Sequence, residues 1–129
     1  MKRILFVEDD QFIVDIYANQ FKKEGYEVDV AGDSKTAFEK LKNTYPDLLV
    51  LDIRIPKEKG GAPVDNEGWE LLKIIRSEPK TKNVKVVVAS NDNEQQNLNN
   101  VSHFGVLKYF LKIQTTPEEM ISAAREILK

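Results

Sequence analysis

A chain of 129 residues has the length of one ordinary domain, enough for one hydrophobic core and too short for two. With 41% hydrophobic and 31% charged residues, its composition is that of a folded, soluble protein. Nineteen basic and 21 acidic residues give a formal net charge of -2, which predicts no attraction to nucleic acid or to an anionic membrane. No cysteine is present, which excludes disulfides and cysteine-bound zinc.

The N-terminal segment MKRILFVEDD has an apolar run only over residues 4–7 before acidic residues follow. This run is too short for a signal peptide or a membrane span. We therefore expect a cytoplasmic protein, with one domain over residues 1–129 and no output domain.

Short apolar runs rich in β-branched residues recur along the chain. In order, they cover residues 4–7, 28–31, 48–51, 84–89 and 106–111. Runs this short and continuous are typical of strands buried on both faces of a parallel sheet.

The segments between these runs carry apolar residues at helical spacing. The first has its stripe at Phe12, Ile13, Ile16, Tyr17 and Phe21 and a stop at Gly25. The second segment has Ala37, Phe38 and Leu41 after a helix cap at Asp33 or Ser34. The third segment ends before Pro79 and has its apolar residues at Trp69, Leu71, Leu72 and Ile75. The fourth segment, residues 93–103, has a weak helical pattern, with only Leu98 and Val101 as apolar anchors. The fifth segment starts at Pro117 and continues through Met120, Ile121, Ala124 and Leu128.

Five strands that alternate with five helices predict an α/β fold, a (βα)5 doubly wound parallel sheet with right-handed crossovers. The one irregular stretch, PKEKGGAPVDNEG at residues 56–68, predicts a long loop after the third strand. Loops of this length in a compact domain are usually functional or mobile.

Polar residues follow the predicted strands at their carboxyl ends, where ligands bind in open α/β sheets. They are Glu8, Asp9, Asp10, Asp52, Ser90 and Lys112. Clustered carboxylates favour a hard divalent cation, Mg²⁺ by preference where phosphate also binds. Asp52 is then a candidate nucleophile toward phosphorus, with Lys112 and Ser90 as partners of the phosphoryl oxygens.

Each of these residues also has an ordinary interpretation. An acidic run after a strand is often a helix N-cap, which we expect for Asp10. Ser90 taken alone could be a helix cap, and Lys112 taken alone could be a surface lysine. An aromatic residue such as Tyr109 in a last strand usually packs in the core or at the sheet edge. The combination at one sheet edge is what favours a site.

The chain resembles the receiver domain of two-component response regulators. The matching segments, in order, are ILFVEDD, LLVLDIRIP, VKVVVAS and GVLKYFLK. The resemblance implies a flavodoxin-like sheet of strand order 2-1-3-4-5. It also implies phosphorylation in a Mg²⁺-dependent reaction, with a sensor histidine kinase or histidine phosphotransfer protein as donor and a downstream protein target, and with no nucleic acid or membrane partner.

The resemblance also implies the residue roles. Asp52 is the phosphoacceptor, Asp9 a direct metal ligand and Glu8 a ligand through water. The backbone carbonyl of Arg54 completes the metal shell. Ser90 is the switch hydroxyl, Tyr109 the switch aromatic and Lys112 the lysine of the family pattern, with Pro56 and Gly105 in the expected positions.

Two features depart from the family pattern. The segment between Pro56 and Gly68 is longer than usual by roughly eight residues. Ile113 stands where a proline normally follows the lysine, so the Lys112–Ile113 peptide bond is trans with a changed loop or cis under strain.

We expect a signalling protein and not an enzyme acting on another substrate. One alternative is a phosphorylation-independent interaction module, a pseudo-receiver. The other is an aspartate-nucleophile phosphohydrolase, which usually has a second acid two residues after the nucleophile, where this chain has Arg54. The motifs GxGxxG and GxxxxGK[ST] of nucleotide-binding proteins are absent.

Overall fold

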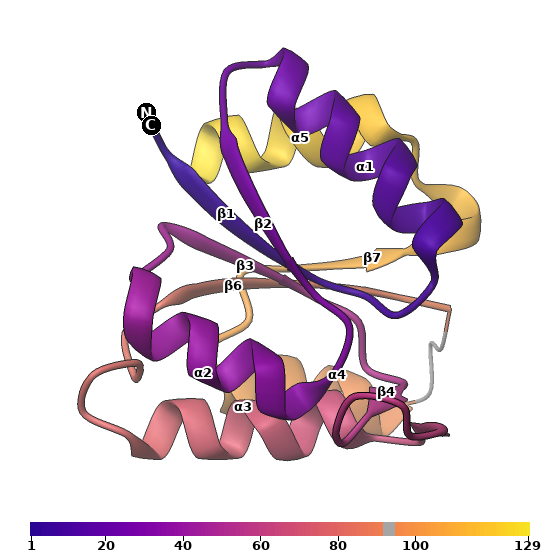
Figure 1. The fold of residues 1–129 in the computed structure, drawn as a ribbon, viewed down its shortest axis with the longest axis vertical. Coiled ribbons are helices and arrows are strands. Elements are labelled where there is room, and N and C mark those ends of the chain that lie inside the picture. Colours follow the sequence, from indigo (N-terminus) through magenta and orange to yellow (C-terminus); the bar gives the residue numbers. More distant parts are fainter. Residues whose placement is uncertain (92–94) are drawn as a thin grey trace.

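The computed structural model describes residues 1–91 and 95–129, which form a parallel sheet between two layers of helices (Figure 1). The sheet contains β1 (Arg3–Val7), β2 (Glu27–Ala31), β3 (Leu48–Leu51), β6 (Lys85–Ser90) and β7 (Lys108–Leu111). The helices are α1 (Gln11–Lys23), α2 (Ser34–Thr44), α3 (Glu67–Ser77), α4 (Gln95–His103) and α5 (Pro117–Ile127), and a 3-10 turn covers Lys112–Gln114. The strand order is β2-β1-β3-β6-β7, which confirms the predicted doubly wound order.

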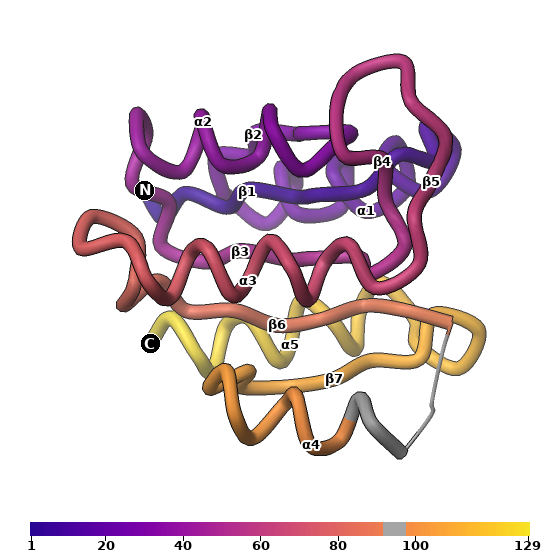
Figure 2. Tube along the Cα trace, turned by 90° about the horizontal axis from the view of Figure 1, so that it is seen from below, coloured from indigo at the N-terminus to yellow at the C-terminus, as the bar shows by residue number. Residues whose placement is uncertain are grey.

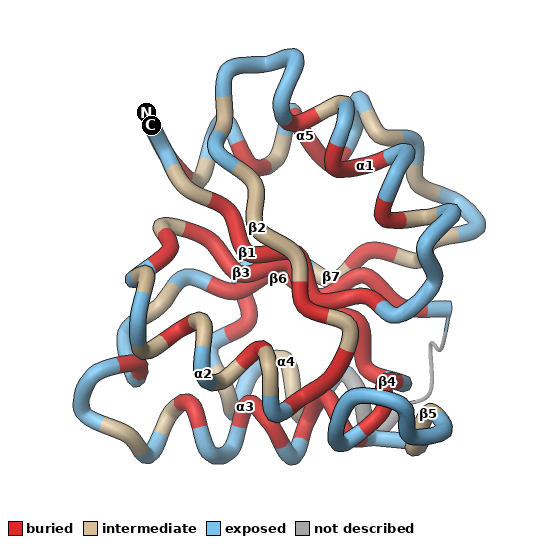
Figure 3. Tube along the Cα trace, viewed as in Figure 1, coloured by how far each residue is buried: buried red, intermediate tan, exposed pale blue. Residues whose placement is uncertain are grey.

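The side chains of the central strands alternate between the two faces of the sheet. In β1, Ile4 and Phe6 pack with α1 and α5, whereas Leu5 and Val7 pack with α2 and α3. Figure 3 shows the buried residues concentrated along the sheet, with exposed residues on the outer sides of the helices. Each fully buried large aliphatic side chain contributes about 1.5–3 kcal/mol, so these strands supply much of the stability that fixes the strand ends.

The expectation that every strand is buried on both faces holds for the central strands only. All residues of β1 after Arg3, all of β3 and all of β6 after Lys85 are buried. In β2 only Ala31 is buried, and in β7 only Phe110. Both are edge strands, as Figure 2 also shows for β7, and an edge strand has a neighbour on one side only.

The predicted helix starts are confirmed by their caps. Asp10 accepts a hydrogen bond from the Phe12 backbone N–H at 3.0 Å, and Asp33, not Ser34, caps α2 by accepting from the Thr36 N–H at 2.8 Å. Thr116 and Glu119 form a capping box before α5, with Pro117 in its first turn. These caps satisfy backbone donors that would otherwise lack a partner in the helix.

The predicted stripe on the first helix was partly wrong. The residues of α1 that are buried are Val14, Tyr17, Ala18 and Phe21, whereas Phe12 is 74% exposed and Ile16 is 43% exposed. Phe12 and Ile16 are four residues apart and lie together on the face of α1 opposite to Val14, because each residue turns the helix by about 100°. The sequence offers two overlapping apolar stripes on this helix. Packing against β1 and α5 buries the stripe that contains Val14, Tyr17 and Phe21.

The fourth helix is present as α4, from Gln95; the expected start at residue 93 lies outside the described residues. Of its two predicted anchors, Val101 packs against the core, but Leu98 is 56% exposed. None of the described helices is long and apolar enough to cross a membrane.

The stretch at residues 56–68, predicted as a long loop, contains a small antiparallel ladder. Strand β4 (Ile55–Pro56) pairs with β5 (Pro63–Val64), with Ile55 opposite Val64. We call residues 55–64 the inserted hairpin. It projects at the carboxyl ends of the sheet strands (Figure 2), and α3 begins at Glu67, shortly after it. Ile55 is fully buried, which ties the hairpin to the core.

Arg76 at the end of α3 holds three neighbouring segments together. Its Nε donates to the Phe104 carbonyl at 2.8 Å, and its Nη1 donates to the carbonyls of Lys82 and Val84 at 2.8 and 2.7 Å. The guanidinium thereby satisfies backbone acceptors that the turns before β6 and after α4 leave without helical or strand partners.

We expect Arg76→Met to lower the free energy of unfolding by about 2 kcal/mol, because the three carbonyls lose their donor and two of these hydrogen bonds are partly buried. Arg125→Met is the matched control: Arg125 is 60% exposed and pairs with Glu24, so its loss should cost less than about 1 kcal/mol. Urea denaturation measures both. Equal losses for the two variants would contradict the role given to Arg76.

Candidate functional site

Three of the predicted site residues lie just past the ends of their strands. Glu8 follows Phe6 by two residues, Asp52 follows Val50, and Lys112 follows Phe110, and these three strand residues pack on the face covered by α1 and α5. The sheet hydrogen bonds extend to this level: the Glu8 N–H donates to the Ala31 carbonyl, and the Asp52 N–H donates to the Val7 carbonyl, both at 3.0 Å. The backbone of both acids is therefore fixed by the sheet.

Lys112 binds both of these acids. Its Nζ donates to Asp52 Oδ2 at 2.9 Å and also to Glu8 Oε1. The three side chains are largely buried, with exposed fractions of 12% for Lys112, 9% for Asp52 and 2% for Glu8. Burial alone would lower the pKa of Lys112, but the charges of Asp52 and Glu8 outweigh it and raise the pKa above its usual value. Lys112 is therefore protonated at neutral pH.

Ionisation of Glu8 is costly in this environment. Burial, together with the nearby charge of Asp52, raises the pKa of Glu8 to about 7, although Lys112 acts in the opposite direction. One lysine thus compensates two buried carboxylates only in part, and the site retains an affinity for further positive charge.

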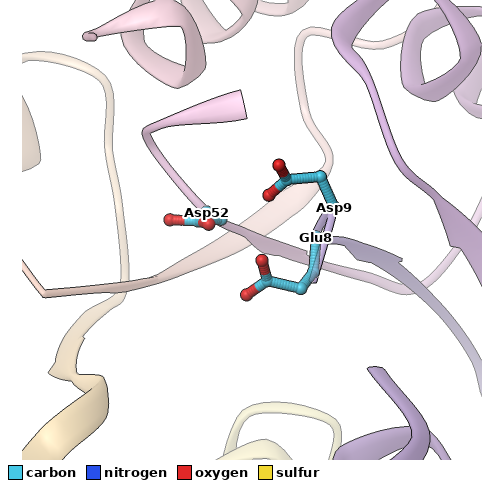
Figure 4. Close-up of side chains that lie close together, drawn as sticks. All are labelled: Glu8, Asp9 and Asp52. Atoms are coloured by element: carbon cyan, nitrogen blue, oxygen red, sulfur yellow. The ribbon is translucent and has the colours of Figure 1, made fainter. Parts of the chain in front are cut away.

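Asp9 adds an exposed carboxylate to the two buried ones. One oxygen from each of Glu8, Asp9 and Asp52 lies within 4.8 Å of the others, and Figure 4 shows the three carboxylates gathered at the strand ends. The donor set consists of oxygen atoms, as Mg²⁺ prefers, and the incomplete charge compensation at Glu8 also favours a cation. The residues present therefore fit a hard divalent cation.

The other predicted residues lie around this cluster. A cleft opens at this cluster, and Ser90, which ends β6 and is 4% exposed, lines it. Arg54 follows Asp52 by two residues and lines the same cleft. Tyr109 is half-buried in β7, where it pairs with Val88 and packs against the core on the α2–α3 side. Ser90 and Val88 share one side of β6, so Tyr109 and Ser90 lie toward the same face of the sheet.

Several residues of the site were not predicted from the sequence. The cleft has a volume of about 560 Å³, and its wall includes Asp10, which the sequence placed at a strand end, and also Ile13, Ile53, Asp65, Asn66 and Asn91, which it did not indicate. Asp65 and Asn66 come from the segment between the inserted hairpin and α3. The only feature of the sequence that pointed to them was the length of the loop. Loop length does not predict which residues of the loop lie at the cleft.

Gly68 is a second residue whose role only the structure reveals. Its N–H donates to the Ile53 carbonyl at 2.8 Å, and a Cβ at this position would lie 2.7 Å from the Asp52 carbonyl oxygen and from Ile53 Cα. The first turn of α3 therefore packs directly on the backbone of Asp52, which no larger residue allows without a shift.

The Lys112–Ile113 peptide bond is trans, since none of the peptide bonds in the described segments is cis. Residues 112–114 form a 3-10 turn, Ile113 is 80% exposed, and Lys112 still reaches both acids. The presence of Ile113 in place of the family's proline therefore leaves the Lys112 ammonium in the site.

A model of the response regulator receiver domain matches residues 4–125. The chain belongs to this family. PhoB, the phosphate regulon transcriptional regulatory protein of Klebsiella pneumoniae, is 25% identical over 128 residues, which cover 99% of this receiver domain chain and 52% of PhoB. Sporulation initiation phosphotransferase F of Bacillus subtilis is 28% identical over 113 residues, covering 87% of this chain and 83% of that protein.

Solved structures give the same result. A CheY-like response regulator receiver domain protein from Methanospirillum hungatei matches with a TM-score of 0.84 and 27% identity, over 99% of this chain and 94% of that one. The receiver fold predicted from the sequence is thereby confirmed. The chain spans about half or less of the length of the first curated relatives that it matches.

We expect Gly68→Ala to lower the free energy of unfolding by about 2–3 kcal/mol, because the added methyl group collides with the backbone at Asp52 and Ile53. Gly32→Ala is the control, since a Cβ at Gly32 meets only the Glu8 carbonyl oxygen, at 3.9 Å. Thermal unfolding followed by circular dichroism compares them. A Gly68→Ala protein as stable as Gly32→Ala would contradict the close contact.

Glu8 predicts a pH dependence of stability. Because its pKa is raised from 4.5 to about 7, the native state holds a proton between these pH values that the unfolded state has released. The contribution of Glu8 to the free energy of unfolding then falls as pH rises through this window, by roughly 3 kcal/mol in total. Glu8→Gln removes this titration, so its stability relative to the wild type should increase from pH 4.5 to pH 8. Urea titrations without added divalent cation measure this, and parallel pH profiles would contradict it.

Proposed function

We propose that this receiver domain is a phosphoacceptor in two-component signal transduction and that Asp52 accepts the phosphoryl group from a phosphohistidine. The observation that carries the proposal is the position of Asp52: a nearly buried carboxylate that faces a cleft, bound by Lys112 at 2.9 Å and clustered with Glu8 and Asp9. A carboxylate with a fixed backbone and one cationic partner is a suitable nucleophile for in-line phosphoryl transfer.

The acidic cluster would hold Mg²⁺. Asp9 and Asp52 would be direct ligands, Glu8 would act through water, and the backbone carbonyl of Arg54 would complete the protein ligands. When bound, the ion neutralises charge on the phosphoryl oxygens. Oxygen donors within 4.8 Å of one another support this assignment.

In the transfer step, an oxygen of Asp52 attacks phosphorus, the bond between phosphorus and the histidine nitrogen breaks, and the electron pair of that bond returns to the imidazole. The product is an acyl phosphate on Asp52. Lys112, already hydrogen-bonded to Asp52, would pair with a phosphoryl oxygen, and the Ser90 hydroxyl would donate to another. These residues reduce the repulsion between two anions that have to approach each other.

Movement of Ser90 toward the phosphoryl group would also carry the signal outward. Tyr109 lies toward the same face and is half-buried, and it would move inward when Ser90 moves. This motion couples a charge change at Asp52 to the surface formed by α4, β7 and α5. A downstream protein would bind that surface or receive the phosphoryl group in turn.

The donor would be a sensor histidine kinase or a histidine phosphotransfer protein, and the only chemistry of the chain would be its own phosphorylation and dephosphorylation. The similarity to a protein named as a phosphotransferase of sporulation initiation supports a role in such transfer. The pseudo-receiver alternative has no support from the site, because the trans peptide bond at Ile113 leaves Lys112 in contact with Asp52.

Intact mass spectrometry after incubation with Mg²⁺ and phosphoramidate, a small phosphodonor, tests the proposal. We expect one phosphoryl adduct on the wild type, loss of the adduct in Asp52→Asn, and loss with a chelator. Asp15→Asn, which changes an exposed acid of α1, is the matched control and should be phosphorylated like the wild type. Absence of any adduct on a folded wild type, without binding of Mg²⁺, would leave the interaction module as the better description.

A further inference from the structure

The inserted hairpin leads directly into the wall of the cleft that contains Asp52. Its ladder pairs Pro56 with Pro63, so the chain returns close to its starting point, and the residues just after it, Asp65 and Asn66, line the cleft. Any influence of this hairpin on phosphorylation rests on the proposed function of Asp52 as the phosphoacceptor.

The hairpin is attached to the body of the protein through Lys57 and through the residues that follow its second strand. The Lys35 N–H, in the first turn of α2, donates to the Lys57 carbonyl at 3.0 Å. Lys57 Nζ donates to Glu67 Oε1 at 2.8 Å, and Glu67 is buried at the start of α3. Gly68 then packs against the Asp52 backbone. Asp65, between these attachments, is therefore held in a defined position relative to the site.

Asp65 binds the side chain of Arg54. Arg54 Nε donates to Asp65 Oδ1 at 2.9 Å, and both residues line the cleft. The pair is open to solvent, with exposed fractions of 65% for Arg54 and 83% for Asp65. An exposed pair of this kind contributes at most about 1 kcal/mol, so the guanidinium can exchange it for a better partner.

The charges around the cleft indicate what that partner is. The described residues that line it include the carboxylates of Glu8, Asp9, Asp10, Asp52 and Asp65, but only two cations, Lys112 and Arg54. Lys112 is largely buried and bound to Glu8 and Asp52, whereas Arg54 is held by an exposed pair. A phosphoryl group on Asp52 adds negative charge, and a guanidinium binds phosphate with two parallel hydrogen bonds. Arg54 is therefore the cation that is better placed to change its partner.

We propose that Asp65 is a positioning residue that holds the Arg54 guanidinium at the mouth of the cleft, and that Arg54 leaves Asp65 for the phosphoryl oxygens when Asp52 is phosphorylated. Asp65 thus competes with the phosphoryl group for Arg54. The inserted hairpin sets the strength of this competition and, through it, how readily the site accepts a phosphodonor.

A double-mutant cycle tests the competition, with phosphorylation by phosphoramidate and Mg²⁺ followed by intact mass. The quantity measured is the donor concentration that gives half of the maximal rate. Arg54→Gln should raise this concentration about fivefold or more, and Asp65→Asn should lower it roughly two- to fivefold. In the Arg54→Gln background, Asp65→Asn should have no effect. Glu58→Gln removes an equal charge from the same hairpin at a residue that neither belongs to the Arg54–Asp65 pair nor lines the cleft, and it should match the wild type.

A second measurement observes the exchange directly by nuclear magnetic resonance. The chain has four arginines, Arg3, Arg54, Arg76 and Arg125, so the Nε–H signal of Arg54 can be assigned by its loss in Arg54→Lys. This signal should shift when the wild type is phosphorylated and stay in place in Asp52→Asn treated in the same way.

The outcomes separate the two proposals. A wild type that is phosphorylated on Asp52, with equal effects of Asp65→Asn in both backgrounds or with an unchanged Arg54 signal, overturns the role of Asp65 alone. A folded wild type that takes no phosphoryl group overturns both proposals.

Discussion

Lys112 carries its ammonium between two buried carboxylates, Asp52 and Glu8, and the rest of the site depends on this contact. Buried ions are expensive unless they are paired, and here one cation faces two anions. Burial, together with the charge of Asp52, raises the pKa of Glu8 to about 7, and the imbalance leaves the site attractive to further positive charge. The backbone of both acids is fixed by the hydrogen bonds of the sheet. The apolar side chains of the buried strands stabilise the fold and offset the cost of the buried charges.

The same contact explains why the site can respond to a change in charge. A site in which every ion was compensated would gain little from a metal or a phosphoryl group, whereas this cleft holds more carboxylates than cations among its described residues. Ser90 lies at the edge of the cleft, and Tyr109 lies toward the same face of the sheet. In the proposed function, a small displacement of Ser90 would reach the α4–β7–α5 surface through Tyr109.

The inserted hairpin distinguishes this receiver domain from the pattern its sequence otherwise follows. It is anchored by buried Ile55 and by the pair that Lys57 forms with Glu67 of α3, and its return places Asp65 beside Arg54. An insertion next to a reactive centre can change a reaction without touching the nucleophile, because it changes the partners of a neighbouring cation.

The fold and the core of the site could be predicted from the residues alone. Five apolar runs alternating with helical patterns permit few topologies, and the strand-end positions of Glu8, Asp52 and Lys112 followed from the topology. Their mutual contact was also foreseeable, because the carboxyl ends of parallel strands share one edge. By contrast, only the tertiary structure shows which apolar stripe of α1 is buried. It alone also shows that Asp65 lies at the cleft. Both depend on contacts between segments distant in the sequence, and a helix with two apolar stripes or a glycine-rich loop carries no local signal that selects one arrangement.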